Sequence, residues 1–205
     1  LSDEKNPQKT IAILDTMNKY ISTTQFPLTF DYIYHIAKLY NDAGAREQTT
    51  KYAQLGIQTC DELLKNPKLV PDLEKYEIIG NYLGPYRISA MLYEMLGDYK
   101  AATDRLKQLY EKTAQIFTQI KDNPQYQEDA QKMEFKLVDL QATINDYTLD
   151  AQVQAGDLNG AIKSAKEMII KYNDTTSQVM IYLKRYVEMK LKELETKRDS
   201  SIARR

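Results

Sequence analysis

Acidic side chains are the residues of this chain with the clearest capacity for chemistry. Two carboxylates held at a fixed separation can hydrolyse a glycosidic bond, one as general acid and the other as nucleophile or base. The sequence offers many candidates, including Asp72, Glu74, Glu77, Asp122 and Glu128. Because 28% of the residues are charged, some acidic pairs will meet by chance in any helical fold. These residues therefore do not by themselves predict a hydrolase.

Other reactive side chains are few. Cys60 and His35 are the single cysteine and the single histidine, which excludes an internal disulfide and a shared histidine metal site. We expect Cys60 to be a small buried apolar residue and His35 to be a packed or surface residue of a helix. The sequence contains no glycine-rich phosphate loop, no paired-histidine zinc motif and no serine elbow. We therefore expect no cofactor, no metal and no enzymatic activity in this chain.

The composition is that of a globular protein with no preference for nucleic acid. Apolar residues make up 42% of the 205 residues, and the formal net charge is −1. No apolar run reaches the roughly 18 residues that a membrane-spanning helix needs. The sequence begins at Leu1 without an initiator methionine, and we interpret it as part of a longer protein.

The apolar periodicity is helical throughout, and no segment alternates as a half-buried strand does. Gly80 and Gly84-Pro85 predict a break between Ile79 and Tyr86, because proline is costly in a helix interior. The predicted helices span 7–21, 29–43, 45–65, 72–96 with this break, 98–121, 125–155, 157–172 and 175–198, the last with Asp174 as its N-cap. We therefore predict an all-α fold of about eight or nine helices in one domain, 1–205, with a possible subdomain joint near 66–71.

Three turns share one pattern, at Gly44, Gly97 and Gly156. Around the middle turn, residues 86–106 indicate two helices folded back on each other. Ala90 and Ala102 allow their backbones to approach closely, and Gly97 adopts a left-handed turn at little cost.

This spacing resembles that of tetratricopeptide repeats. The matching positions are Tyr86, Ala90, Tyr93, Gly97, Ala102 and Leu106. A first copy matches in part, with Ile33, Ala37, Tyr40 and Gly44, then Thr49 where alanine is expected. A third copy, Asn145, Leu149, Gln152, Gly156, Ala161 and Ala165, fits only in its turn and its second helix. The three glycines are 53 and 59 residues apart, whereas the family period is about 34 residues. The resemblance implies a tetratricopeptide-like stack of elongated antiparallel hairpins, and an ordinary antiparallel helical bundle is the alternative.

In a tetratricopeptide-like stack, the first helix of each hairpin lines a concave groove. By register, the residues on that face are Tyr34, Lys38, Asn41, Arg87, Met91, Glu94, Asp146 and Asp150. Their mixed charges suit a peptide or a polar segment of a protein, and we expect such a partner. Tyrosines at 76, 82, 86 and 93 gather around the predicted break, where they either fill the core or form an interface.

The last predicted helix has an apolar stripe at Met180, Leu183, Val187, Leu191 and Leu194. Such a stripe either covers the end of the stack or pairs with a second copy of the chain. We favour the covering role and keep a homodimer through this helix as the alternative.

The whole chain has a second, looser resemblance. The segments Asn6–Ile21, Phe26–Leu28 and Ile36–Gly44 are similar to the C-terminal tail of an uncharacterised family of bacterial multi-pass membrane proteins. The membrane part of that family resembles protein O-mannosyltransferases. The resemblance implies attachment to the bacterial cell envelope through a missing N-terminal region, with the tail on the periplasmic side and any catalysis in the membrane part.

These observations predict a non-catalytic protein-interaction or scaffold domain. The alternatives are a free-standing envelope adaptor of the tetratricopeptide kind and a helical dimerisation module.

Overall fold

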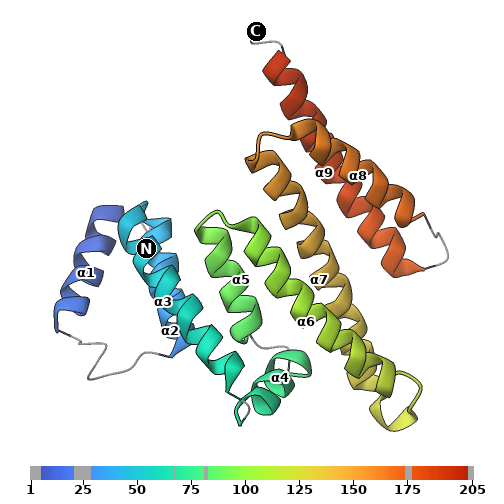
Figure 1. Ribbon diagram of the computed structural model, residues 1–205, viewed down its shortest axis with the longest axis horizontal. Helices are drawn as coiled ribbons and strands as arrows, with labels where there is room; N and C mark the ends of the chain where they lie inside the picture. The colour runs from blue at the N-terminus through green and yellow to red at the C-terminus, as the bar shows by residue number, and fades with distance from the viewer. Residues whose placement is uncertain (1–5, 21–28, 67, 81–82, 174–176, 203–205) are drawn as a thin grey trace. The chain divides into compact units, whose positions relative to one another are not determined.

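The computed structural model describes residues 6–20, 29–66, 68–80, 83–173 and 177–202. Within these ranges it contains nine α-helices, one short 3₁₀ helix and no strand (Figure 1). The prediction of an all-α fold with about eight or nine helices is confirmed. None of the described helices is both long enough and apolar enough to span a bilayer.

The helices form two compact units, 1–105 and 106–205. The division falls inside α6 (Tyr99–Ile120), whereas we expected one domain with a possible joint near 66–71. The 66–71 segment does not divide the chain because the helices on either side of it, α3 and α5, pack against each other. Each unit has its own cluster of buried apolar side chains.

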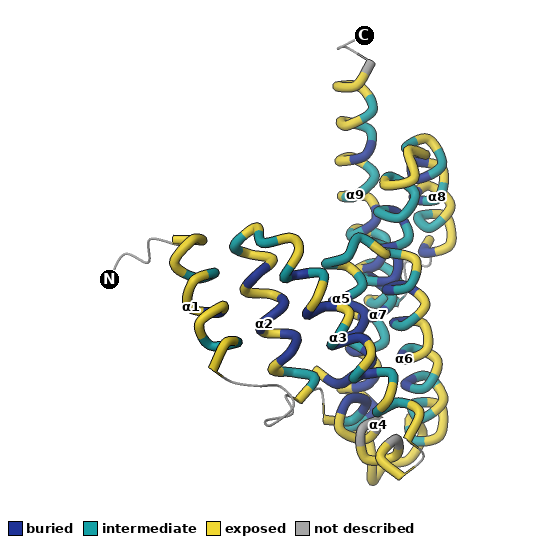
Figure 2. Tube along the Cα trace, turned by 60° about the vertical axis from the view of Figure 1, so that its left-hand side comes forward, coloured by how far each residue is buried: buried dark blue, intermediate teal, exposed yellow. Residues whose placement is uncertain are grey.

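In the first unit, α2 (Phe30–Asp42) and α3 (Arg46–Lys65) form an antiparallel hairpin, and α5 (Pro85–Met95) packs against both. The short helix α4 (Val70–Ile78) contacts α3 and α5, and α1 (Pro7–Tyr20) contacts α2. Figure 2 shows that α2 and α3 carry most of the buried residues near this end, whereas α1 is largely exposed. The N-terminal helix α1 is therefore much more exposed than the α2–α3 hairpin beside it.

The second unit repeats this arrangement. After the 3₁₀ turn η1 (Pro124–Tyr126), α7 (Gln127–Gln154) and α8 (Leu158–Lys171) form a hairpin, and α9 (Gln178–Ile202) packs against both. The stripe predicted on the last helix is used in this packing, since Leu183, Val187 and Leu194 are buried. The covering role of α9 thus accounts for the stripe. The N-cap predicted at Asp174 lies outside the described residues.

The three predicted turns have one geometry. Gly44, Gly97 and Gly156 have φ angles of 74°, 75° and 78°, in the left-handed region that glycine adopts without a steric cost. In each turn the glycine N–H donates to a carbonyl three residues earlier, and the next N–H donates to a carbonyl five residues earlier. This is the Schellman motif, which satisfies carbonyls at the end of a helix. The pattern read from the sequence therefore marks real helix ends.

The predicted break between Ile79 and Tyr86 is present, because α4 ends at Ile78 and α5 begins at Pro85. The fully buried carboxylate of Glu77 accepts hydrogen bonds from the backbone N–H groups of Tyr86 (3.1 Å) and Arg87 (2.7 Å). It satisfies donors that the first turn of α5 leaves without helical partners. A Cβ atom at Gly84 would collide with this carboxylate, so the glycine makes room for it.

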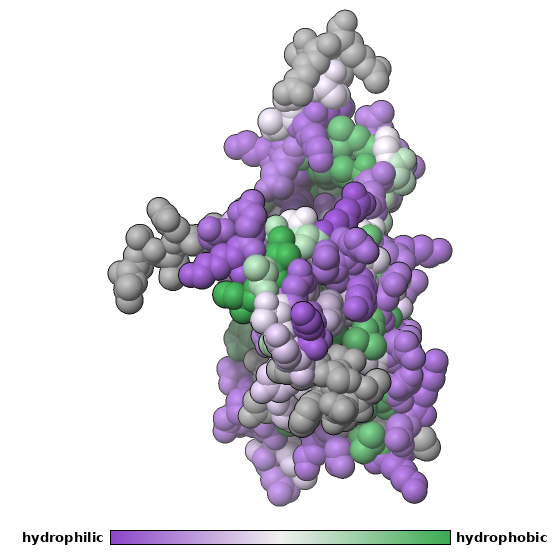
Figure 3. Space-filling model, turned by 90° about the vertical axis from the view of Figure 1, so that its left-hand side faces the viewer, coloured by the Kyte–Doolittle hydropathy of each residue, from purple (hydrophilic) through white to green (hydrophobic). Residues whose placement is uncertain are grey.

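The end of the first unit that carries α1 is mainly hydrophilic, with small apolar patches between charged side chains (Figure 3). On α1 itself, Ile13 and Tyr20 are exposed and Leu14 is buried. Ile11 and Met17 are half-buried against the apolar cluster of this unit beside Leu14, and polar contacts add to this apolar packing.

Candidate functional site

The residues predicted to line a groove belong to both units. Tyr34, Lys38 and Asn41 lie on α2, and Arg87, Met91 and Glu94 lie on α5, which contacts α2 in the first unit. Asp146 and Asp150 lie on α7 of the second unit. The predicted residues therefore lie on α2 and α5 in the first unit (the first face) and on α7 in the second (the second face).

On the first face, Tyr34 is buried and the charged residues surround it. Burial raises the pKa of Tyr34, the Lys38 charge lowers it, and Glu94 and Asp42 raise it further. Lys38 forms an exposed ion pair with Asp42 at 3.0 Å, and this hydrogen bond raises the pKa of Lys38. Lys38 and Glu94 therefore both lie near Tyr34, and the buried Tyr34 offers little surface to a ligand.

The remaining residues of this face contribute less surface than the register suggested. Met91 is half-buried against the apolar core. Arg87 is half-buried, and its backbone N–H is held by Glu77. Asn41 is exposed, and its carbonyl accepts from Gly44 in the turn.

On the second face, acidic residues of α7 meet a lysine of α9. Lys190 Nζ lies 2.7 Å from Asp146 Oδ1. Burial acts to lower the pKa of Lys190, but the hydrogen bond and charge of Asp146 and the charge of Asp150 outweigh it, and the pKa is raised. Burial also raises the pKa of the neighbouring Tyr186, and Asp146 raises it further. Lys190 therefore forms an ion pair with Asp146 and also feels the charge of Asp150. The register of α7 did not indicate this basic residue.

An apolar hollow of about 320 Å³ lies on the same two helices. Phe135 and Val138 of α7 and Val179 and Tyr182 of α9 line it. Phe135 is 70% exposed and Tyr182 is 54% exposed, which is unusual for large aromatic side chains. Periodicity alone could not find this site, because it depends on which parts of α7 and α9 lie side by side.

The first unit has a larger apolar hollow, of about 930 Å³, where α2 begins and α3 ends beside α4. Its apolar lining residues are Phe30, Tyr32, Leu63, Leu69, Tyr76 and Leu83. Tyr76 belongs to the predicted tyrosine cluster and is exposed. In that cluster Tyr86 is buried and Tyr93 is half-buried, and Tyr82 lies outside the described residues.

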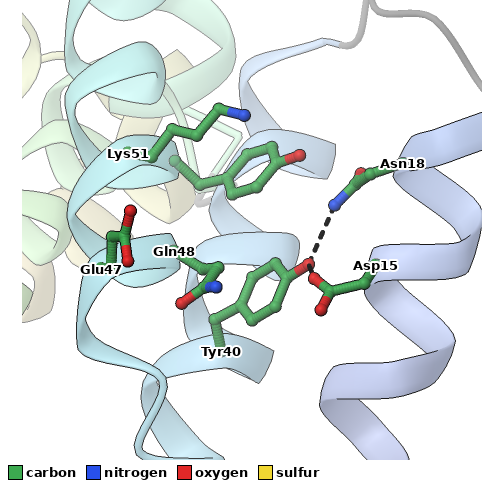
Figure 4. Close-up of a pocket in the computed structure, with 7 residues that line it drawn as sticks. Asp15, Asn18, Tyr40, Glu47, Gln48 and Lys51 are labelled. Carbon is green, nitrogen blue, oxygen red and sulfur yellow. Dashed lines mark hydrogen bonds between the residues drawn. The ribbon is translucent and has the colours of Figure 1, made fainter.

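A polar pocket of about 270 Å³ lies between α1 and the α2–α3 hairpin (Figure 4). Its lining residues are Asp15, Asn18, Tyr40, Glu47, Gln48, Lys51 and Tyr52. The Tyr40 hydroxyl accepts from Asn18 Nδ2 at 2.9 Å and donates to Asp15 Oδ1 at 2.7 Å. The two tyrosine rings are stacked, 5.6 Å apart.

The surroundings of this pocket favour the protonated form of its two tyrosine hydroxyls. Burial and the hydrogen bond to Asp15 raise the pKa of Tyr40, and burial raises that of Tyr52. The sequence analysis missed this pocket because Asp15 and Asn18 meet α2 and α3 only in the tertiary structure. The polar side chains on the inner side of a weakly apolar α1 were the available signal.

The reactive residues considered first occupy ordinary structural positions. Cys60 is fully buried, as expected, and burial raises its pKa to about 12. His35 is exposed beside the ring of Tyr34. Glu77 is the cap of α5 described above. Among the described residues, no group of three or more histidine, cysteine, aspartate or glutamate side chains is arranged to hold a metal ion.

No protein-family model, curated protein or solved structure matches the chain.

Proposed function

We propose that this chain is a non-catalytic protein-interaction domain that uses the α7–α9 face of the second unit. The observation that carries the proposal is the pair of exposed aromatic residues, Phe135 and Tyr182, at an apolar hollow. Exposed aromatic residues beside a hollow are typical anchors of a protein interface, because they bury a large apolar area when a partner binds.

The charged residues farther along the same helices support this function. Asp146 and Lys190 are each mostly shielded from solvent and form a defined ion pair. A fixed pair of this kind orients a polar partner segment more than it strengthens binding. The face thus combines an apolar anchor site with a polar stretch, which fits the predicted peptide or protein partner.

The proposed architecture is a stack of tetratricopeptide-like hairpins. The register of buried small residues supports it, since Ala37, Ala53, Ala102, Ala161 and Ala165 are almost fully buried at the helix contacts. We further propose that the domain is the periplasmic tail of a bacterial membrane protein, which rests on the resemblance of its segments alone. An upstream reading frame with many apolar spans would support this context, and a frame that starts near Leu1 would contradict it.

A photo-crosslinking experiment tests the interaction function. The full chain carrying p-benzoylphenylalanine at position 135 should crosslink one defined partner in the source cells. Tyr182→Ser should abolish this crosslink, because it removes the other aromatic wall of the hollow. Ile170→Ser on α8 is the matched control, because Ile170 is equally apolar and 74% exposed but lies away from the hollow.

The outcome of this experiment is decisive in both directions. A crosslink that survives Tyr182→Ser, or that is lost equally in Ile170→Ser, would contradict the proposed face. A crosslink to a second copy of this chain would instead favour the dimerisation alternative through α9, and light scattering would show the dimer. Such a dimer would use exposed residues of α9, such as Tyr182 and Met189, because the apolar stripe is covered.

A further inference from the structure

The polar pocket between α1 and the α2–α3 hairpin has charges that are not balanced by one another. Asp15 and Glu47 supply two carboxylates, and Lys51 supplies one ammonium group. Figure 4 shows Asp15 on α1 and Glu47 on α3 at opposite sides of the pocket. The lining is therefore net negative, which favours a ligand group with a positive charge.

Glu47 and Lys51 are spaced to neutralise each other and do not. A glutamate four residues before a lysine on a helix is the favourable order for an ion pair. Lys51 Nζ lies instead 5.5 Å from the centre of the Tyr52 ring. Within the part of the chain that the structure describes, Glu47 has no hydrogen bond or ion pair. Its carboxylate remains available to a ligand.

The second carboxylate is held in a fixed orientation. Tyr40 is fully buried, and its hydroxyl connects Asn18 to Asp15 Oδ1 through the two hydrogen bonds described above. Among the described residues, Asp15 Oδ2 accepts no hydrogen bond. A carboxylate oriented in advance loses little freedom when it binds a donor, which favours binding.

The size of the pocket limits the ligand to a small group. Its volume of about 270 Å³ is below the roughly 300–1,000 Å³ of pockets that enclose drug-sized molecules. A planar guanidinium group offers several N–H donors that match carboxylate oxygens, and an ammonium group offers three.

We propose that this pocket binds the guanidinium or ammonium group of an arginine or lysine side chain in the partner protein. This inference rests on the proposed interaction function and adds a requirement for a basic residue in the partner. It uses α1, α2 and α3 of the first unit, whereas the apolar anchor site belongs to the second unit.

Titration of the ¹⁵N-labelled full chain with a capped arginine, Nα-acetyl-arginine N-methylamide, tests the chemistry. The side-chain amide signals of Asn18 and Gln48 should shift in a saturable manner, and capped lysine should act at the same signals. The matching citrulline compound, which has the same shape without the charge, should bind at least tenfold more weakly. Equal shifts with citrulline would overturn the proposal.

Two variants locate the site. Glu47→Gln should weaken capped-arginine binding at least fivefold without disturbing the fold, because no described residue depends on Glu47. Asp15→Asn keeps an acceptor for Tyr40 and should have a similar effect. Glu62→Gln is the matched control on α3, away from the pocket. Unchanged binding in both pocket variants would contradict the site.

The source of the basic group is tested with the partner identified by crosslinking. The double variant Asp15→Asn/Glu47→Gln should bind that partner at least tenfold more weakly, and Glu62→Gln should not. Unchanged partner binding would overturn the partner assignment and favour a free small cation. The effect of Tyr182→Ser on the crosslink from position 135 tests the anchor site separately. The two proposals can therefore fail independently.

Discussion

The two units use one packing arrangement with different cores. In each, the two helices of a hairpin contact each other and a later helix contacts both: α5 packs on the α2–α3 hairpin in one unit, and α9 packs on the α7–α8 hairpin in the other. In the first unit, Ile33 lies eleven residues before the turn glycine and Cys60 lies sixteen residues after it, and both belong to the apolar cluster. The second unit has Asn145 and Tyr172 at those positions.

Each polar atom of the pair in the second unit has a hydrogen-bond partner. Asn145 Nδ2 donates to the Tyr172 hydroxyl at 3.0 Å, and that hydroxyl can donate back to Asn145 Oδ1 at 3.2 Å. Gln141 supplies a further hydrogen bond to Asn145. The comparison shows that this packing arrangement accepts either an apolar layer or a hydrogen-bonded one at these two positions.

The units also differ in how the start of a helix is capped, as α5 of the first unit and α8 of the second show. The first unit fixes the start of α5 with the buried carboxylate of Glu77, whereas the second begins α8 with Asp157, an exposed cap that accepts from Gly160 at 2.8 Å. The first unit therefore depends on a buried charged group where the second depends on a solvated one.

The largest expected effect tests this difference. Glu77→Ala should lower the free energy of unfolding of the first unit by about 4 kcal/mol, because it removes two hydrogen bonds to a buried charged group. Asp157→Ala, the matched change, should cost about 1 kcal/mol in the second unit. Hydrogen exchange can measure the two units separately. Equal losses would remove the distinction between the two caps.

A second change tests whether α9 is an integral part of its unit. Leu183→Ala should cost about 3 kcal/mol, because it leaves a cavity where α9 packs against α7 and α8. Met189→Ala on the same helix should be nearly neutral, because Met189 is exposed. Chemical denaturation followed by circular dichroism would measure both. A small effect of Leu183→Ala would mean that α9 is not needed to cover the second unit.

A third change tests the polar layer. Asn145→Ala should destabilise the second unit by about 2 kcal/mol, because the buried Tyr172 hydroxyl loses its partner. The double variant Asn145→Leu/Tyr172→Phe replaces both polar groups with apolar ones, as in the first unit, and should recover much of this loss. Denaturation midpoints of the three proteins would decide the matter. A double variant less stable than Asn145→Ala would contradict the equivalence of the two layers.

The smallest change concerns the reactivity of Cys60, which reports on the first unit alone. Because burial raises its pKa to about 12 from 9.0, the folded thiol stays protonated and should react with a disulfide reagent only after unfolding. In the unfolded chain the thiol has its ordinary pKa of 9.0. The protonated Cys60 thiol therefore contributes fully to stability below pH 9, and this contribution decreases as the pH rises toward 12. Labelling rates in increasing urea should follow the opening of the first unit. Rapid labelling of the native protein at pH 8 would contradict the burial.

The helices were predictable because their signals are local. Glycine is the residue that takes up the positive φ angles at 44, 97 and 156, and Pro85 can begin a helix but not continue one. The end of α9 was less predictable, because it reaches Ile202 rather than residue 198. No glycine or proline marks that end, so the sequence had no local signal for it.

The candidate sites were only partly predictable. Register placed Tyr34 and Lys38 on one face of α2, because residues four apart lie on the same side of a helix, whereas Glu94 lies near Tyr34 because α5 packs on α2. It did not reveal that Tyr34 is buried, since burial depends on the neighbouring helix α5. It also missed Lys190 beside Asp146 and the joining of Asp15, Tyr40 and Glu47 in one pocket, because these contacts link residues far apart in the sequence.

The sequence by itself determined that the chain is helical, where its turns lie and which small residues allow close helix contacts, because each of these properties depends on a few neighbouring residues. Only the tertiary structure decided where the units divide and which polar and aromatic side chains share a surface. Those outcomes depend on how whole helices pack, and side chains from separate helices combine into a site only after that packing is set.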